Sequence, residues 1–135
     1  MLTITRFRLP VLLAVLLALA GCNLAREGDL PTPVPALEVS FQSPENMAQF
    51  RAGDEVTLLL LAEDSAGPGV ARVELRVDEQ PHQEGAPEVS EAVPVFTVSM
   101  RWRANSPGLH SLTAIAYRAD GSASTPATIV LEVVP

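Results

Sequence analysis

The chain has 135 residues and a formal net charge of −7 at pH 7, a length that allows one domain with a tail. A chain this acidic repels phosphate backbones, so we expect no nucleic-acid partner. It contains one cysteine, which excludes an intramolecular disulfide.

The N-terminal segment has the pattern of a secretory signal peptide. Residues 1–8 carry Arg6 and Arg8 and no acid, and residues 9–20, "LPVLLAVLLALA", are apolar throughout. A basic segment followed by a short apolar segment is typical of export signals. The apolar run is too short to cross a bilayer as a helix, which needs about 20 residues. A short core helix is the alternative, but the run has no polar face. We therefore assign residues 1–21 to a signal peptide.

The single cysteine directly follows this segment. Leu19-Ala20-Gly21-Cys22 resembles the lipobox of bacterial lipoproteins. The resemblance implies that the thiol receives a diacylglyceryl group and that signal peptidase II cleaves before Cys22. Two acyl chains give stable anchoring where one gives only marginal binding. A catalytic nucleophile would need a base within reach, and a structural thiol would need a core around it. We expect a lipid anchor in the cell membrane, facing the extracytoplasmic side.

A proline-rich segment separates the cysteine from the rest of the chain. Residues 23–35 read "NLAREGDLPTPVP" and include Pro31, Pro33 and Pro35. Proline fixes φ and disfavours helix in the residue before it. At about 3.1 Å per residue the segment would reach up to about 40 Å. Residues 22–35 are thus predicted to be the lipidated cysteine and an extended tether.

From residue 36 onward, apolar and polar residues alternate with a period of two, as in half-buried strands. The residues expected to face inward are Leu37, Val39 and Phe41; Val56, Leu58, Leu60 and Ala62; Val73, Leu75 and Val77; Phe96, Val98, Met100 and Trp102; Leu112, Ala114 and Ala116; and Ile129, Leu131 and Val133. Turn residues separate these segments. Residues 79–91 lack the alternation and hold four acids, which predicts a long loop or an irregular edge.

This spacing of short strands predicts an all-β fold for residues 36–135. The best match is an Ig-like antiparallel β-sandwich of about seven strands. No β-α-β alternation occurs, so we do not expect a parallel sheet. Trp102 carries the largest side chain and is predicted to anchor the core.

The same region resembles the bacterial Ig-like domains of exported proteins and lipoproteins. Gly53-Asp54 precedes the second strand, and Gly69-Val70 precedes a strand that ends at Asp78. A tryptophan is then followed by Pro-Gly and an alanine-rich strand. The resemblance implies a display or interaction module whose partner is an envelope protein. The chain lacks the cysteine pair of antibody-type domains.

The sequence offers no pattern typical of a catalytic or metal site. His82 and His110 have no second histidine at metal-ligand spacing, so we expect no metal and no cofactor. Ser111 lies beside His110 but on the opposite face of its strand, and no Gly-x-Ser-x-Gly occurs, so we expect no catalytic residue and no enzyme activity. Acids at strand ends, such as Asp64 and Asp78, suit calcium, but we interpret them as solvated groups or turn caps.

Four apolar side chains are expected to project from the outer sides of their strands: Leu59, Leu61, Ile115 and Tyr117. If they cluster, they form a docking face; alternatively, residues 79–91 cover them. The sequence thus predicts a non-catalytic, membrane-anchored lipoprotein that displays an Ig-like interaction module at the cell envelope. The alternative is a module that binds carbohydrate or a cell-wall polymer through exposed aromatic rings, for which only Phe50 and Tyr117 are candidates.

Overall fold

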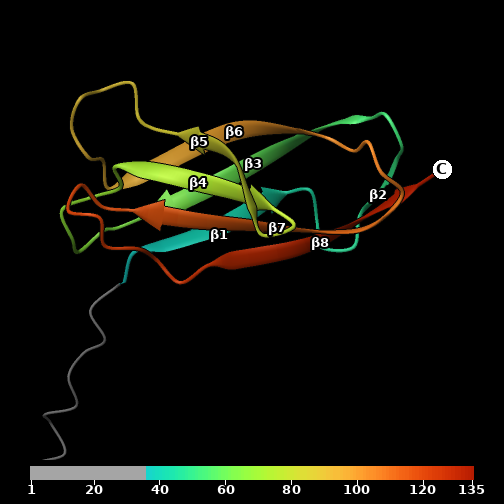
Figure 1. Cartoon of the computed structure of the whole chain (residues 1–135). Coiled ribbons are helices and arrows are strands. Elements are labelled where there is room, and N and C mark those ends of the chain that lie inside the picture. The colour runs from blue at the N-terminus through green and yellow to red at the C-terminus, as the bar shows by residue number, and fades with distance from the viewer. Residues whose placement is uncertain (1–35) are drawn as a thin grey trace, which may run out of the picture. The chain divides into compact units, whose positions relative to one another are not determined.

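Eight strands pair into two sheets that pack face to face in the computed structural model, which describes residues 36–135 (Figure 1). The strands are β1 (Glu38–Ser43), β2 (Gln49–Arg51), β3 (Glu55–Glu63), β4 (Arg72–Val77), β5 (Gln80–Gly85), β6 (Val95–Arg103), β7 (Gly108–Tyr117) and β8 (Ala127–Val134). No helix of this region is long and apolar enough to cross a bilayer. The predicted signal peptide and tether, residues 1–35, lie outside the described residues.

The strand order confirms the predicted Ig-like β-sandwich. One sheet has three strands in the order β1-β3-β6, and the other has five in the order β2-β8-β7-β4-β5. All pairs are antiparallel except β2 with β8, which is parallel. This parallel contact differs from the all-antiparallel sandwich that we expected, and it involves only three residues of β2.

The inner faces of the two sheets form the hydrophobic core. Trp102 is 6% exposed, and every residue that the alternation placed inward is buried or packs against the buried core. Burial of one such large apolar side chain stabilises the fold by about 1.5–3 kcal/mol. The core runs from Leu37 to Val133. Residues 36–135 therefore hold a complete core, and we expect them to fold without the preceding segment.

Two strands were not predicted from the alternation. β5 occupies residues 80–85, where we expected a loop or an irregular edge; the loop interpretation is wrong for these residues. β5 is an edge strand whose side chains are almost all exposed, so it has no buried face to produce a period of two. Its pairing with β4 shifts register between Leu75 and Arg76. β2 is too short to show a pattern.

A buried ion pair joins the two sheets at the end where β3 and β7 terminate. Asp64, which follows β3, is 1% exposed. It accepts hydrogen bonds from Arg118 Nε and Nη2, both at 2.8 Å, and from the Gly69 N–H at 3.0 Å. The bonds from Arg118 lower the pKa of Asp64, although burial acts to raise it. A Cβ at Gly67 would overlap this carboxylate, so the loop requires glycine there.

We predict that Asp64→Ala destabilises the domain by about 3 kcal/mol, because it leaves Arg118 and the Gly69 amide without their buried acceptor. Urea unfolding of residues 36–135, followed by circular dichroism, measures the effect. Glu88→Ala, which removes an exposed acid from the β5–β6 loop, is the control and should leave the midpoint unchanged. Equal midpoints for the two variants would contradict a structural role for Asp64.

Candidate functional site

The four residues expected to form one docking face lie on opposite sides of the sandwich. Leu59 and Leu61 project from β3 on the outer side of the three-stranded sheet, whereas Ile115 and Tyr117 belong to β7 of the five-stranded sheet. Ile115 is only 8% exposed. The single face is therefore wrong, because alternation does not tell which layer a strand joins. β5 extends the edge of the five-stranded sheet and does not cover the leucines.

Cys22 and the lipobox residues Leu19, Ala20 and Gly21 lie outside the described residues.

Tyr117 belongs to a polar network on the outer side of the five-stranded sheet. The Arg72 guanidinium carbon lies 3.8 Å from the centroid of the Tyr117 ring, a cation–π arrangement. The Tyr117 hydroxyl donates to Glu74 Oε2 at 3.3 Å, and Arg76 Nε donates to Glu74 Oε1 at 2.6 Å. Arg72 also pairs with Glu84 at 3.0 Å. One face of the tyrosine ring is thus covered by a cation, and the charges around it are mutually paired.

A shallow groove of about 480 Å³ lies along β4 and β5 beside this network. Its lining residues are polar or proline: Glu74, Arg76, Pro81, His82, Gln83 and Glu84. The ion pair between Glu74 and Arg76 lies within it. The two acids that line the groove, Glu74 and Glu84, are therefore already paired with arginines.

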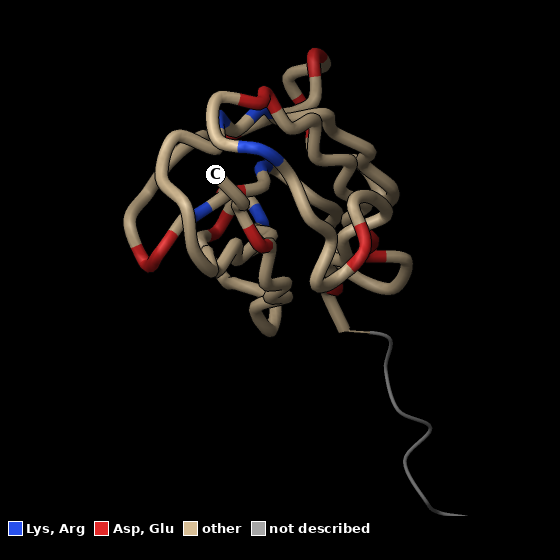
Figure 2. The backbone as a smooth tube through the Cα atoms, turned by 90° about the vertical axis from the view of Figure 1, so that its right-hand side faces the viewer, with Lys and Arg blue, Asp and Glu red and all other residues tan. Residues whose placement is uncertain are grey.

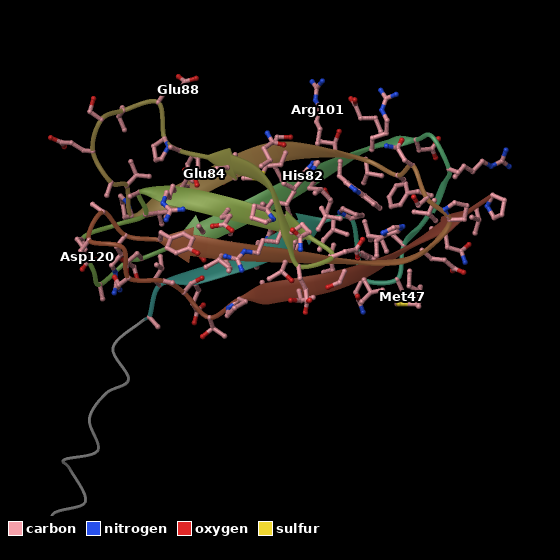
Figure 3. All side chains as sticks on the ribbon, viewed as in Figure 1. Met47, His82, Glu84, Glu88, Arg101 and Asp120 are labelled. Atoms are coloured by element: carbon pink, nitrogen blue, oxygen red, sulfur yellow. The ribbon has the colours of Figure 1, made fainter. Side chains whose placement is uncertain are left out.

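β5 also reaches across to the edge of the other sheet. His82 Nε2 lies 2.8 Å from the carbonyl oxygen of Arg101 on β6, and the Arg101 N–H donates to Gln83 Oε1 at 3.1 Å. Figure 3 shows His82 and Arg101 at this side of the domain. In an antiparallel pair, main-chain groups that do not face the partner strand face outward. His82 and Gln83 therefore occupy the outward edge of β6 at Arg101.

His110 connects two turns at the opposite end of β7 from Tyr117. Its Nδ1 lies 2.6 Å from Asp78 Oδ2, and its Nε2 lies 2.7 Å from the carbonyl oxygen of Ser106. Both partners are acceptors, so the protonated imidazole, in which both ring nitrogens donate, can make both bonds at once. The bond to Asp78 is the largest cause that raises the pKa of His110 above 6.5. The ring lies 5.2 Å from that of Trp102.

The same contact holds a strained turn between β4 and β5. Asp78 and Glu79 have positive φ values of 50° and 69°, a conformation that two-residue hairpins usually give to Asn and Gly. Asp78 Oδ1 accepts from the Ser111 N–H at 2.9 Å. Burial acts to raise the pKa of Asp78, but the bonds from His110 and Ser111 outweigh it and lower the pKa. The side chain of Asp78 thus fixes the turn to β7.

Two acids that lie in turns, Asp54 and Asp120, also have local partners. Asp54 Oδ2 accepts from the Arg51 N–H at 2.9 Å, and Asp120 Oδ1 accepts from the N–H and hydroxyl of Ser122. Among residues 36–135, no three His, Cys, Asp or Glu side chains come together as metal ligands would. The carboxylates of Asp54 and Asp120 therefore cap turns. The long-range pairs of Asp64 and Asp78 have no signal in the sequence, because 54 and 32 positions separate the partners.

The exposed residues of β1, β3 and β6 around Leu59 and Leu61 form a surface that we call the leucine face. Leu59 is 37% exposed. Acidic positions are spread over the domain, and the basic positions lie among them in the upper left part of the view (Figure 2). On the leucine face, acidic and basic residues lie toward opposite ends of the strands. Glu38 lies opposite Glu63 at one end. Toward the other end, Arg101 and Arg103 pair with a single carboxylate, Glu55, at 3.5 and 3.8 Å.

Comparison with known proteins agrees with this architecture. Residues 38–114 match the family model described as bacterial Ig domain. No curated protein sequence matches the chain. The fibronectin(III)-like modules of Clostridium thermocellum CbhA are 25% identical, with a TM-score of 0.58, over 71% of this chain and 96% of theirs.

Two further structures share the fold alone. The CARDB domain of PF1109 from Pyrococcus furiosus, solved with di-metal ions, is 13% identical with a TM-score of 0.58, over 76% of this chain and 90% of its own. The SrpA adhesin of Streptococcus sanguinis is 16% identical with a TM-score of 0.52, over 76% of this chain and 57% of its own.

We predict that the stability of the domain falls as the pH rises above neutrality. Because the pKa of His110 is raised on folding, its contribution is fully present below about pH 6.5 and is lost as the pH passes the folded-state pKa. Urea midpoints measured between about pH 5.5 and 8.5 should decline in the wild type. They should be flat in His110→Gln, whereas His82→Gln should retain the decline. An unchanged slope in His110→Gln would contradict the assignment.

Proposed function

Because the chain belongs to the bacterial Ig domain family, we propose that it is a non-catalytic interaction module held at the cell envelope by a lipid on Cys22. The observation that carries the proposal is the family match over residues 38–114. The buried or partly buried polar side chains described above stabilise the sandwich. Asp64 and His110 join elements of the sandwich. What the domain offers to a partner is the outer surface of its sheets.

The anchor rests on the sequence of residues 19–22, in which a cysteine directly follows the predicted export signal. The geometry of the domain suits an anchor on this side. Residue 36 and the C-terminus lie at opposite ends of the sandwich (Figure 1), so an attachment before residue 36 leaves the C-terminal end free. A lipid with two acyl chains would supply the membrane affinity.

The carbohydrate-binding alternative has less support from the aromatic residues. Sugar rings stack on open aromatic faces, and the two candidates for this role were Phe50 and Tyr117. Phe50 packs against the core, and Arg72 covers one face of the Tyr117 ring. We therefore favour a protein partner, and the alternative becomes an outcome of the test below.

We predict that the full chain, expressed in a bacterial host, incorporates labelled palmitate and that Cys22→Ser abolishes the label. The double variant Cys22→Ser with Ser43→Cys is the matched control: it keeps one thiol but moves it out of the lipobox, and it should stay unlabelled. The measurement is autoradiography of the immunoprecipitated protein. Label in Cys22→Ser equal to that in the wild type would overturn the anchor.

We predict that capture with the full chain from crosslinked cells recovers a defined envelope protein, and that purified cell-wall polysaccharide does not retain residues 36–135. Arg72→Ala tests the alternative directly, because it uncovers the Tyr117 ring. If sugar stacks there, Arg72→Ala should bind polysaccharide more strongly than the wild type. Retention of the wild type on polysaccharide, increased by Arg72→Ala and without a protein partner, would replace our proposal with the alternative.

A further inference from the structure

The leucine face carries opposite charges at its two ends. At the end where β3 terminates, Glu38 and Glu63 are direct cross-strand neighbours, an arrangement of like charges that destabilises a pair of strands. Toward the other end, two exposed arginines share Glu55, which leaves one positive charge in excess. Leu59 and Leu61 occupy the rows between. A partner that reverses this order of charges would relieve both ends at once.

We propose that the partner of the leucine face is the leucine face of a second copy of this chain. A two-fold axis that crosses the strands at right angles, between the rows of Leu59 and Leu61, reverses the ends of the face. It brings the leucines of both copies together at the centre and the acidic end of each copy toward the arginines of the other. The inference gives a partner to the proposed interaction module and rests on that function for its biological setting.

The register of β3 and β6 shows which charges meet. Four successive rows of the face pair Glu63 with Val95, Leu61 with Thr97, Leu59 with Ser99, and Thr57 with Arg101. The two-fold axis exchanges the first row with the fourth. Glu63 therefore faces Thr57 of the second copy, one strand away from its Arg101. Adjacent strands lie about 4.8 Å apart, a distance that the long side chains of Glu63 and Arg101 span.

The same axis leaves β1 above β1, β3 above β3 and β6 above β6. The β1 edge of the three-stranded sheet, where the described chain begins, is therefore on the same side of the dimer in both copies. Two molecules anchored through their N-terminal segments in one membrane can thus pair by this face. Anchoring also raises the local concentration of the module, so a weak contact is sufficient.

The size of the face predicts a weak dimer. Strands β3 and β6 have nine residues each and β1 has six. At about 3.3 Å per residue and about 4.8 Å between strands, they cover about 380 Å² per copy. The total of about 760 Å² is below the range of about 1,200–2,000 Å² that stable interfaces bury. We therefore expect a dissociation constant well above the micromolar range for the domain in solution.

Pairing by strand edges is the competing geometry, and the structure disfavours it. A second strand added along β6 would meet His82 and Gln83, whose side chains already hold the main chain of Arg101. The outer surface of the sheet has no such obstruction at Leu59, which is 37% exposed. Face-to-face contact therefore leaves the existing hydrogen bonds of β6 in place.

Charge reversal tests the proposal by sedimentation of residues 36–135, which hold the complete core. Glu63→Arg and Arg101→Glu should each weaken self-association by about tenfold or more, because each alone opposes like charges across the axis. An equal mixture of the two variants should restore it, since both contacts across the axis are then between opposite charges. Glu88→Arg is the matched control: it makes the same change of charge in the β5–β6 loop (Figure 3) and should leave association unchanged.

Two further variants distinguish pairing through the leucine face from pairing through the edge of β6. Leu59→Glu should abolish the dimer. His82→Ala should leave it unchanged, because His82 of β5 covers the main chain of Arg101 at the edge of β6 and lies outside the leucine face. Circular dichroism of each variant verifies that the domain is folded.

A wild type that stays monomeric at millimolar concentration would overturn the inference. So would a mixture no tighter than its components, or a dimer that survives Leu59→Glu and is strengthened in His82→Ala, which uncovers the edge of β6. None of these outcomes bears on the lipid at Cys22, which palmitate labelling tests separately.

Discussion

The burial of one face of each sheet against the other is the constraint on which the rest of this structure depends. A sandwich of this size has a single apolar layer, and alternate residues of six strands fill it, from Leu37 to Val133. Polar groups are consequently found at strand ends, where they join elements, or on the outer faces of the sheets. The chemistry of the domain is therefore that of its surface.

The polar groups that enter the sandwich hold its ends together. Asp64 and Arg118 link the end of β3 to the end of β7, and so connect the two layers. Asp78 and His110 link the β4–β5 turn to β7. In each case, several donors of the folded chain bind the carboxylate in place of the water that hydrates it in the unfolded chain. The two contacts differ in one respect: only that of His110 depends on a proton gained near neutral pH.

The sequence was sufficient to predict the core but not the arrangement of the layers. Alternation identified the inward residues of six strands, including Trp102, because one face of each is buried. It placed Leu59 and Ile115 together on an outer side, and they are on different sheets, since the period of a strand carries no information about its neighbours. The exposed edge strand β5 has no alternation to detect. The partners of Asp64 and His110 were equally hidden, because no local pattern records a contact between distant positions.

The small area of the leucine face bears on how such a module works. A partly polar face of a few hundred Å² cannot give tight binding alone, since association must first offset the loss of translational and rotational freedom. Confinement to a membrane reduces that loss, because it holds the partners at high effective concentration. A lipid at Cys22 and a weak contact at the leucine face would therefore act together. Without the anchor the face should be largely unoccupied, and without the face the anchor would only localise the domain.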